Sequence, residues 1–296
     1  MWGWMKTRKK RGGLFLGYTL FAFLMFLLFL YWTFPFDLLQ SKLILSLEEA
    51  TGCQMEVGEK KIRFPLRLAW GNVRGRCPQG PMAQWEIESI DAHLSLLPLL
   101  WSRRGEIDFQ VRLAGGMIAG RLAAVRKGGR FFLSIKEEGK RLDLARLGPG
   151  MSGLLHLEGD GNWIDRDFLK GEGALSFTFE EVRAKEIGKW PIPIGEIAFS
   201  NIRGKVRWRN GMVTIEQFAA QGPEADLDHD GGNLLIRVPL EVSLLSLNLK
   251  VTPKGNLKQL APVFVQNYSD REPLKVGVNG PLNQLKFLVN GVALNL

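Results

Sequence analysis

The sequence is poor in the side chains on which most catalytic and metal sites depend, with only three histidines and two cysteines among 296 residues. Two cysteines cannot supply a four-thiolate zinc site, and the histidines are too widely spaced to favour a mixed one. His93, His156 and His229 each lie on or beside a predicted strand, where a histidine is usually a surface or hydrogen-bonded residue. We therefore expect no metal site and no histidine base.

The signature motifs of the common enzyme classes are missing as well. The chain has no P-loop, no dinucleotide-binding glycine fingerprint after a strand, no Gly-x-Ser-x-Gly elbow and no His-Glu-x-x-His. Its carboxylates are scattered, so no pair for acid and base catalysis can be nominated. We expect a protein that is not an enzyme and that uses no cofactor.

Acidic side chains are absent before Asp37, and this gap accounts for much of the net charge of +9. Five of the positive charges come from Lys6, Arg8, Lys9, Lys10 and Arg11. The remaining residues therefore carry only +4. A large domain with that balance has no strong attraction for phosphate backbones, and we expect no nucleic-acid partner.

The segment from Leu14 to Phe34 contains no Asp, Glu, Lys or Arg. As a helix it would span about 30 Å, the thickness of a bilayer core. We predict a transmembrane anchor over residues 13–36, with Leu14, Phe21, Leu28 and Trp32 among its residues. The basic residues before it place the tail, residues 1–12, in the cytoplasm and residues 37–296 on the other side.

A cleaved signal peptide is the competing interpretation of the same segment. Its apolar core is usually about 7 to 15 residues long and ends in small residues at a cleavage site. Here the bulky run from Tyr31 to Phe36 follows instead. We therefore expect the anchor to remain attached.

The two cysteines, Cys53 and Cys77, both lie beyond the predicted anchor. An oxidising compartment would permit a disulfide between them. Two buried free thiols explain the sequence equally well, so the bridge is a candidate only.

Residues 37–52 have the pattern of a helix, with Asp37 at the N-cap and Gly52 just past its end. Beyond it the hydrophobic period changes to two for most of the chain, which predicts strands with one apolar face. The clearest apolar sets are Ile107, Phe109, Val111 and Leu113; Leu175, Phe177 and Phe179; Val206 and Trp208; and Leu245, Leu247, Leu249 and Val251. Gly115-Gly116 and Asn210-Gly211 are predicted turns.

The predicted fold class is mainly β: an N-terminal transmembrane helix plus an elongated, antiparallel and groove-like sheet with few helices. Residues 140–153 and 183–195 break the alternation, and we interpret both as crossovers. They would join two halves of one sheet, residues 37–150 and 151–296.

The segment from Asp226 to Gly231 resembles the first half of a calcium-binding loop, because Asp226, Asp228 and Asp230 precede a glycine at the usual spacing. Arg237 stands where the final bidentate glutamate is required, and the flanks are strand-like. We expect a polar turn between strands, with calcium as a weak alternative.

A second charged feature is a basic stripe on one face of a predicted strand. Its residues are Arg203, Lys205, Arg207 and Arg209. The stripe could contact anionic lipid or an acidic partner, whereas a solvated strand face is the more common explanation.

Several stretches, taken in order, resemble those of a known family. They are Phe34 to Leu39, Thr51-Gly52, Val57 to Leu68, Leu94 to Leu100, Ile107 to Val111, Gly115 to Gly120, Asn210 to Val213, Gly232 to Leu240, Ser246 to Leu249 and Val278 to Leu282. The order resembles that of protein N of the type II secretion system, and more distantly that of AsmA-like envelope proteins.

This resemblance implies a Gram-negative inner-membrane protein with a periplasmic β domain that acts as a structural or assembly subunit of type II secretion, in contact with other secretion subunits. It carries over no functional residues. The rival expectation is an AsmA-like lipid-binding or lipid-transfer protein, in which the apolar strand faces hold phospholipid acyl chains, because a one-sided sheet must cover that face.

Overall fold

The computed structural model describes residues 17–26, 28–29, 32–33, 35–63, 67–77, 84–95, 104–127, 130–147, 151–164, 170–185, 196–237, 242–264 and 272–294. The chain divides into two compact units, Met1–Gln54 and Met55–Leu296. Each unit is described by itself.

In the first unit, the described residues before Pro35 are helical and exposed, Phe21, Leu28 and Trp32 among them. No helix in the described part of the chain is both long and apolar enough to cross a membrane. Leu14 and the tail, residues 1–12, lie outside that part. The anchor therefore stays a prediction.

Helix α2, Phe36–Thr51, starts two residues earlier than an N-cap at Asp37 would place it. Pro35, not Asp37, occupies the N-cap, and Asp37 lies in the first turn, where a carboxylate favours the helix dipole. The predicted end is confirmed, because Gly52 has a φ of 68° and its N–H donates to the Glu48 carbonyl at 2.8 Å.

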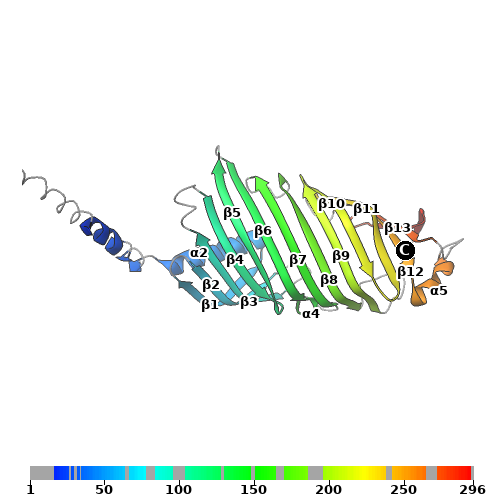
Figure 1. The fold of residues 1–296 in the computed structure, drawn as a ribbon, viewed down its shortest axis with the longest axis horizontal. Helices are drawn as coiled ribbons and strands as arrows, with labels where there is room; N and C mark the ends of the chain where they lie inside the picture. Colours follow the sequence, from blue (N-terminus) through cyan, green and yellow to red (C-terminus); the bar gives the residue numbers. More distant parts are fainter. Residues whose placement is uncertain are drawn as a thin grey trace, which may run out of the picture. The chain divides into compact units, whose positions relative to one another are not determined.

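The second unit is a single antiparallel sheet of fifteen strands in which neighbours in sequence are neighbours in space (Figure 1). The strands are β1 Gln54–Arg63, β2 Arg67–Arg76, β3 Gln84–Ser95, β4 Arg104–Leu113, β5 Gly116–Lys127, β6 Arg130–Asp143, β7 Met151–Ile164, β8 Glu172–Lys185, β9 Glu196–Arg209, β10 Met212–Gln221, β11 Ala225–Leu235, β12 Leu244–Pro253, β13 Leu274–Pro281, β14 Lys286–Val289 and β15 Val292–Leu294. Among the described residues of this unit, two helices accompany the strands, α4 Leu144–Leu147 and α5 Gly255–Phe264. The predicted mainly β class, with one antiparallel sheet and few helices, is confirmed.

The Asn210-Gly211 turn lies where expected, whereas the turn predicted at Gly115-Gly116 lies one residue earlier, at Ala114 and Gly115, and Gly116 begins β5. Asn210 and Gly211, with φ values of 50° and 77°, connect β9 to β10. The two predicted crossovers are wrong, because β6 pairs directly with β7 and β8 with β9. Strands β6 and β7, which lie on either side of the boundary between the predicted halves, pair with each other.

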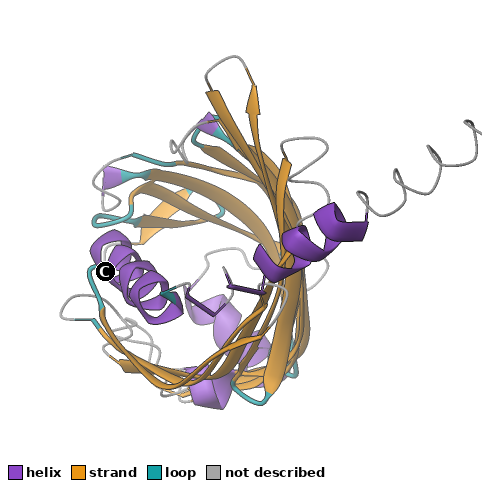
Figure 2. Ribbon diagram, turned by 90° about the vertical axis from the view of Figure 1, so that its left-hand side faces the viewer, coloured by secondary structure: helices purple, strands orange, loops and turns teal. Residues whose placement is uncertain are grey.

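Three strands contain a residue other than glycine with a positive φ: Asn72 in β2, Arg141 in β6 and Glu181 in β8. The side-chain alternation changes at these points, so that Phe179 and Val182, or Gly139 and Leu142, share a face. Such irregularities bend a strand and increase its twist. Figure 2 shows the strong curvature of the sheet.

The ends of the strands form two rims along the sheet. The upper rim is the one at which β4, β6, β8, β10 and β12 begin, and the lower rim is the opposite one, near α4 and α5 (Figure 1). Most of the buried apolar side chains among the described residues of this unit gather at the lower rim: Ala114, Leu142, Leu144, Val182, Ala220, Ala225 and Ala261. The packed core of this unit therefore lies along the lower rim.

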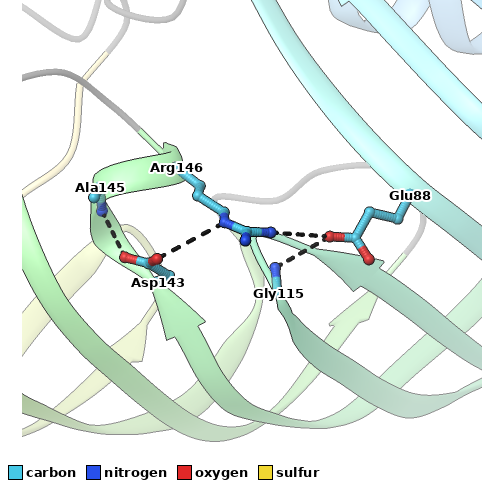
Figure 3. A network of polar contacts seen from close by, with 5 residues as sticks. All are labelled: Glu88, Gly115, Asp143, Ala145 and Arg146. Atoms are coloured by element: carbon cyan, nitrogen blue, oxygen red, sulfur yellow. Dashed lines mark hydrogen bonds and ion pairs between the residues drawn. The ribbon is translucent and has the colours of Figure 1, made fainter.

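A network of polar contacts connects β3, the β4–β5 turn and α4 at the lower rim (Figure 3). The Arg146 guanidinium of α4 lies 3.6 Å from Glu88 Oε1 on β3 and 3.8 Å from Asp143 Oδ2. Glu88 also accepts a hydrogen bond from the Gly115 N–H at 3.2 Å. Asp143 accepts one from the Ala145 N–H at 3.0 Å. These contacts join the β4–β5 turn to the segment after β6.

Candidate apolar ligand surface

One face of the sheet is apolar along its length. Ile107, Phe109, Val111 and Leu113 on β4 lie opposite Leu94, Ala92 and Ile90 of β3 and Leu122, Gly120 and Ile118 of β5. At the far end, Leu245 to Val251 of β12 lie between Leu234 and Leu227 of β11 and Gly280 to Leu274 of β13. The predicted alternation is therefore confirmed in both regions.

This apolar face is only half-buried. The apolar residues of β4, from Ile107 to Leu113, and of β12, from Leu245 to Val251, all retain intermediate exposure. A sheet normally buries its apolar face beneath a second layer. The described helices of this unit are short, and α4 and α5 pack against β7 and β12. The apolar face of the described strands is therefore left partly exposed.

Aromatic rings lie over glycines of the neighbouring strand at several points of the sheet. A Cβ added to Gly204 would lie 2.1 Å from Phe177 Cζ, and one added to Gly120 would lie 2.6 Å from Phe109 Cζ. The two partners are directly opposite in register in both cases. Trp85 over Gly75 and Trp208 over Gly173 repeat the arrangement.

Such pairing stabilises a strand that contains glycine, because the ring covers backbone that glycine leaves exposed. It also keeps these large side chains close to the backbone of the neighbouring strand. An elongated apolar molecule such as an acyl chain can approach a surface of this kind along its length.

The histidines lie apart, on three different strands. His93 is exposed on β3, opposite Asp108, and His156 Nε2 lies 3.9 Å from Glu180 Oε2. His229 belongs to the apolar face, opposite Leu249, and its Nε2 atom is buried without a hydrogen-bond partner. The structure does not bring the three together.

The candidate calcium ligands lie along strand β11, not in a turn, which corrects the expected polar turn. Asp226, Asp228 and Asp230 alternate with apolar-face residues, and their Cα atoms are separated by about 6.8 Å per pair of residues in an extended strand. Lys254 lies 2.6 Å from Asp226, and Lys250 lies 2.5 Å from Asp230. Within the described residues no three metal-ligating groups converge.

Electrostatics support the assignment of Asp230 to an ion pair. The hydrogen bond from Lys250 holds the pKa of Asp230 below its ordinary value, with smaller contributions from the charges of Lys250 and Lys275. On the same polar face, the Asp108 carboxylate, 2.7 Å from Arg121, raises the pKa of that guanidinium. Both ion pairs lie on the polar face and are exposed to solvent.

The basic stripe lies on the polar face of β9 and is partly neutralised. Lys205 and Arg207 contact the same carboxylate, that of Glu216, at 3.4 and 2.9 Å. Arg209 lies 3.2 Å from Glu172, and the Arg203 side chain donates to Asn201. The sequence did not reveal Glu216 as a partner, because a register shift between Ile215 and Gln217 brings it beside β9.

The two cysteines flank the first hairpin. Cys53 directly precedes β1 and Cys77 directly follows β2, two neighbouring strands of the sheet. Both are disulfide-bonded, so the bridge closes the open end of this hairpin.

A hollow of about 520 Å³ lies at the upper rim, between the ends of β4 to β9. Its lining mixes apolar side chains with cations; Phe132, Trp163, Arg104, Lys170 and Arg209 are among them. Trp163 stacks on Trp208 with ring centroids 6.2 Å apart. The hollow has an amphipathic lining, and no motif in the sequence predicted it.

Comparison of the chain with protein-family models, with curated proteins and with solved structures gives no match. The resemblance to protein N of type II secretion therefore rests on the sequence patterns alone.

Proposed function

We propose that the chain is an envelope protein that binds the acyl chains of phospholipids on the apolar face of its sheet. The observation that carries this proposal is the half-buried apolar face that extends from β3 to β13. Each methylene transferred from water to such a surface contributes about 0.8 kcal/mol. An acyl chain laid across several strands would therefore gain enough to offset the cost of ordering it.

The proposed role is binding, without catalysis and without a cofactor. Polar groups are rare on the apolar face: Glu137, opposite Gly120 and Gly159, and the isolated His229. An arrangement of this kind suits a ligand with a long apolar part. The proposed location is the periplasmic side of the inner membrane, with residues 13–36 as anchor.

Site-specific photocrosslinking tests this proposal. A photoreactive phenylalanine analogue replaces Phe109, on the apolar face, in one full-length protein and Gln110, on the polar face, in a second. After irradiation in cells, mass spectrometry should find phospholipid attached at position 109 and not at position 110. Equal labelling at both positions, or phospholipid at neither, would refute acyl-chain binding on this face.

An assembly role in type II secretion is the second candidate, and the sheet edge supports it. Strand β15, Val292–Leu294, is the last strand of the sheet, and Val292 is 69% exposed. An edge strand can pair with a strand of another protein. Crosslinks from position 293 to another secretion subunit, with no phospholipid at position 109, would favour assembly over lipid binding.

A further inference from the structure

The two rims of the sheet differ sharply in charge. Each rim is taken here as the two terminal residues of every strand from β2 to β14 that end at it, together with the described residues that connect those strands. The upper rim then holds nine cations and one carboxylate: Arg67, Arg104, Arg126, Lys127, Arg130, Lys170, Arg209, Arg237 and Lys286, with Glu172. The lower rim holds seven cations and five carboxylates: Arg76, Arg112, Arg146, Lys185, Lys254, Lys258 and Lys275, with Asp143, Glu196, Glu224, Asp226 and Glu272.

The upper rim also exposes large apolar side chains among its cations. The exposed residues on or next to it are Phe132, Ile164, Met212, Val242 and Leu244, each at least 36% exposed. The lower rim also has two exposed methionines, Met117 and Met151, but it contains most of the buried apolar residues of this unit. The lower rim is therefore the packed one, and the upper rim presents cations and apolar groups to its surroundings.

The hollow at the upper rim adds a third amphipathic element. Arg104 and Lys170 line it together with Phe132 and Trp163, and Arg104 and Arg209 remain 54% and 70% exposed at their side chains. Aromatic rings and the long stems of arginine and lysine favour the boundary between headgroups and acyl chains, where one end of the side chain is apolar and the other is hydrated.

We propose that the upper rim is a docking surface for an anionic phospholipid bilayer. Clustered lysine and arginine attract anionic headgroups, and side chains such as Phe132 and Met212 can enter the interfacial layer. A solely electrostatic partner, such as nucleic acid or an acidic protein, would give these exposed apolar residues no role. The proposal goes beyond acyl-chain binding, because docking does not require a loaded apolar face.

Docking would have a further consequence if the apolar face does bind acyl chains. The upper ends of the strands would then meet the membrane, and the packed lower ends would face away from it. A lipid could pass between the bilayer and the apolar face without crossing water.

A vesicle-binding experiment tests the docking surface with the full chain. The protein is reconstituted in nanodiscs of neutral lipid, and its binding to vesicles containing phosphatidylglycerol is measured. The test variant is Arg104→Gln/Lys127→Gln/Arg130→Gln on the upper rim. The matched control, Arg76→Gln/Arg112→Gln/Lys275→Gln, removes the same charge from the lower rim, and the basic tail is unchanged in all three proteins.

The upper-rim variant should bind anionic vesicles on the order of 100-fold more weakly than the wild type, and the lower-rim control should lose far less. Higher ionic strength should weaken the wild-type binding. Equal losses in the two variants, or wild-type binding to heparin without binding to the vesicles, would overturn the proposal. Phospholipid that copurifies with each protein is measured in parallel, so that failure of docking is distinguished from failure of acyl-chain binding.

Discussion

Phe177 on β8 and Gly204 on β9 are directly opposite in the sheet, and the ring of Phe177 occupies the space where a Cβ of residue 204 would stand. The relationship is repeated by Phe109 with Gly120 and by Trp208 with Gly173. In these pairs the ring fills the space above the glycine. The fit can be tested by adding a single methyl group to the glycine.

Gly204→Ala should destabilise the protein by about 1–3 kcal/mol, because the new methyl group must displace the Phe177 ring. Chemical denaturation gives the free energy of unfolding. Gly105→Ala is the matched control, since a Cβ there meets only the Ala124 carbonyl at 3.8 Å. Phe177→Leu combined with Gly204→Ala should recover part of the loss; no recovery would contradict the proposed fit.

His229→Leu should leave the stability unchanged or raise it by about 1–2 kcal/mol, because it removes a buried nitrogen that has no hydrogen-bond partner. The exposed His93 provides the comparison, and His93→Leu should bring no such gain. A clear loss of stability in His229→Leu would mean that the imidazole makes an interaction that its surroundings do not reveal.

The lower rim should depend more on packing than on charge. Leu144→Ala should cost about 2–5 kcal/mol, because Leu144 is 4% exposed and its removal leaves a cavity. Arg146→Ala should cost about 0–1 kcal/mol, because its ion pairs with Glu88 and Asp143 are exposed to solvent. Thermal unfolding of the two variants checks the order, and a larger effect from Arg146→Ala would reverse our interpretation.

The Asp230–Lys250 pair should make a pH-dependent contribution to stability. The pKa of Asp230 is lowered in the folded chain, so the unfolded chain binds a proton first as the pH falls. The contribution is therefore complete above the ordinary pKa of 3.8 and is lost as the pH falls through the folded value. Asp230→Asn should lower the urea midpoint at pH 7 and have little effect in strong acid.

Lys250→Gln is the partner variant for this test. It should show the same pH dependence as Asp230→Asn, and the double variant should add little to either, since both remove one interaction. Independent, additive effects of the two substitutions would show that the pair isn't the source of the pH dependence.

The alternation of side chains made the sheet predictable from the sequence. Ile107 to Leu113 and Leu245 to Val251 have the period of a strand with one apolar face, and Asn210-Gly211 has the residues that a tight hairpin needs. These patterns depend only on residues close together in the sequence, so they can be recognised without knowledge of the rest of the fold.

The features that depend on how strands pair were not predictable. The bends at Arg141 and Glu181 place ordinary residues at positive φ, for which neither side chain gives a signal. Glu216 meets Arg207 only through a register shift. The basic rim gathers residues as distant in sequence as Arg67 and Lys286, and it becomes visible only when the order of the strands is known.

Because each strand of the sheet is bonded to its neighbours in the chain, no strand has to be inserted between two that are already paired. Insertion or deletion of a hairpin would change the extent of the sheet by about 10 Å and leave the remaining pairs as they are. The distance that such a protein spans is thus a quantity that evolution can adjust in steps, by duplication of short segments, without redesigning the fold.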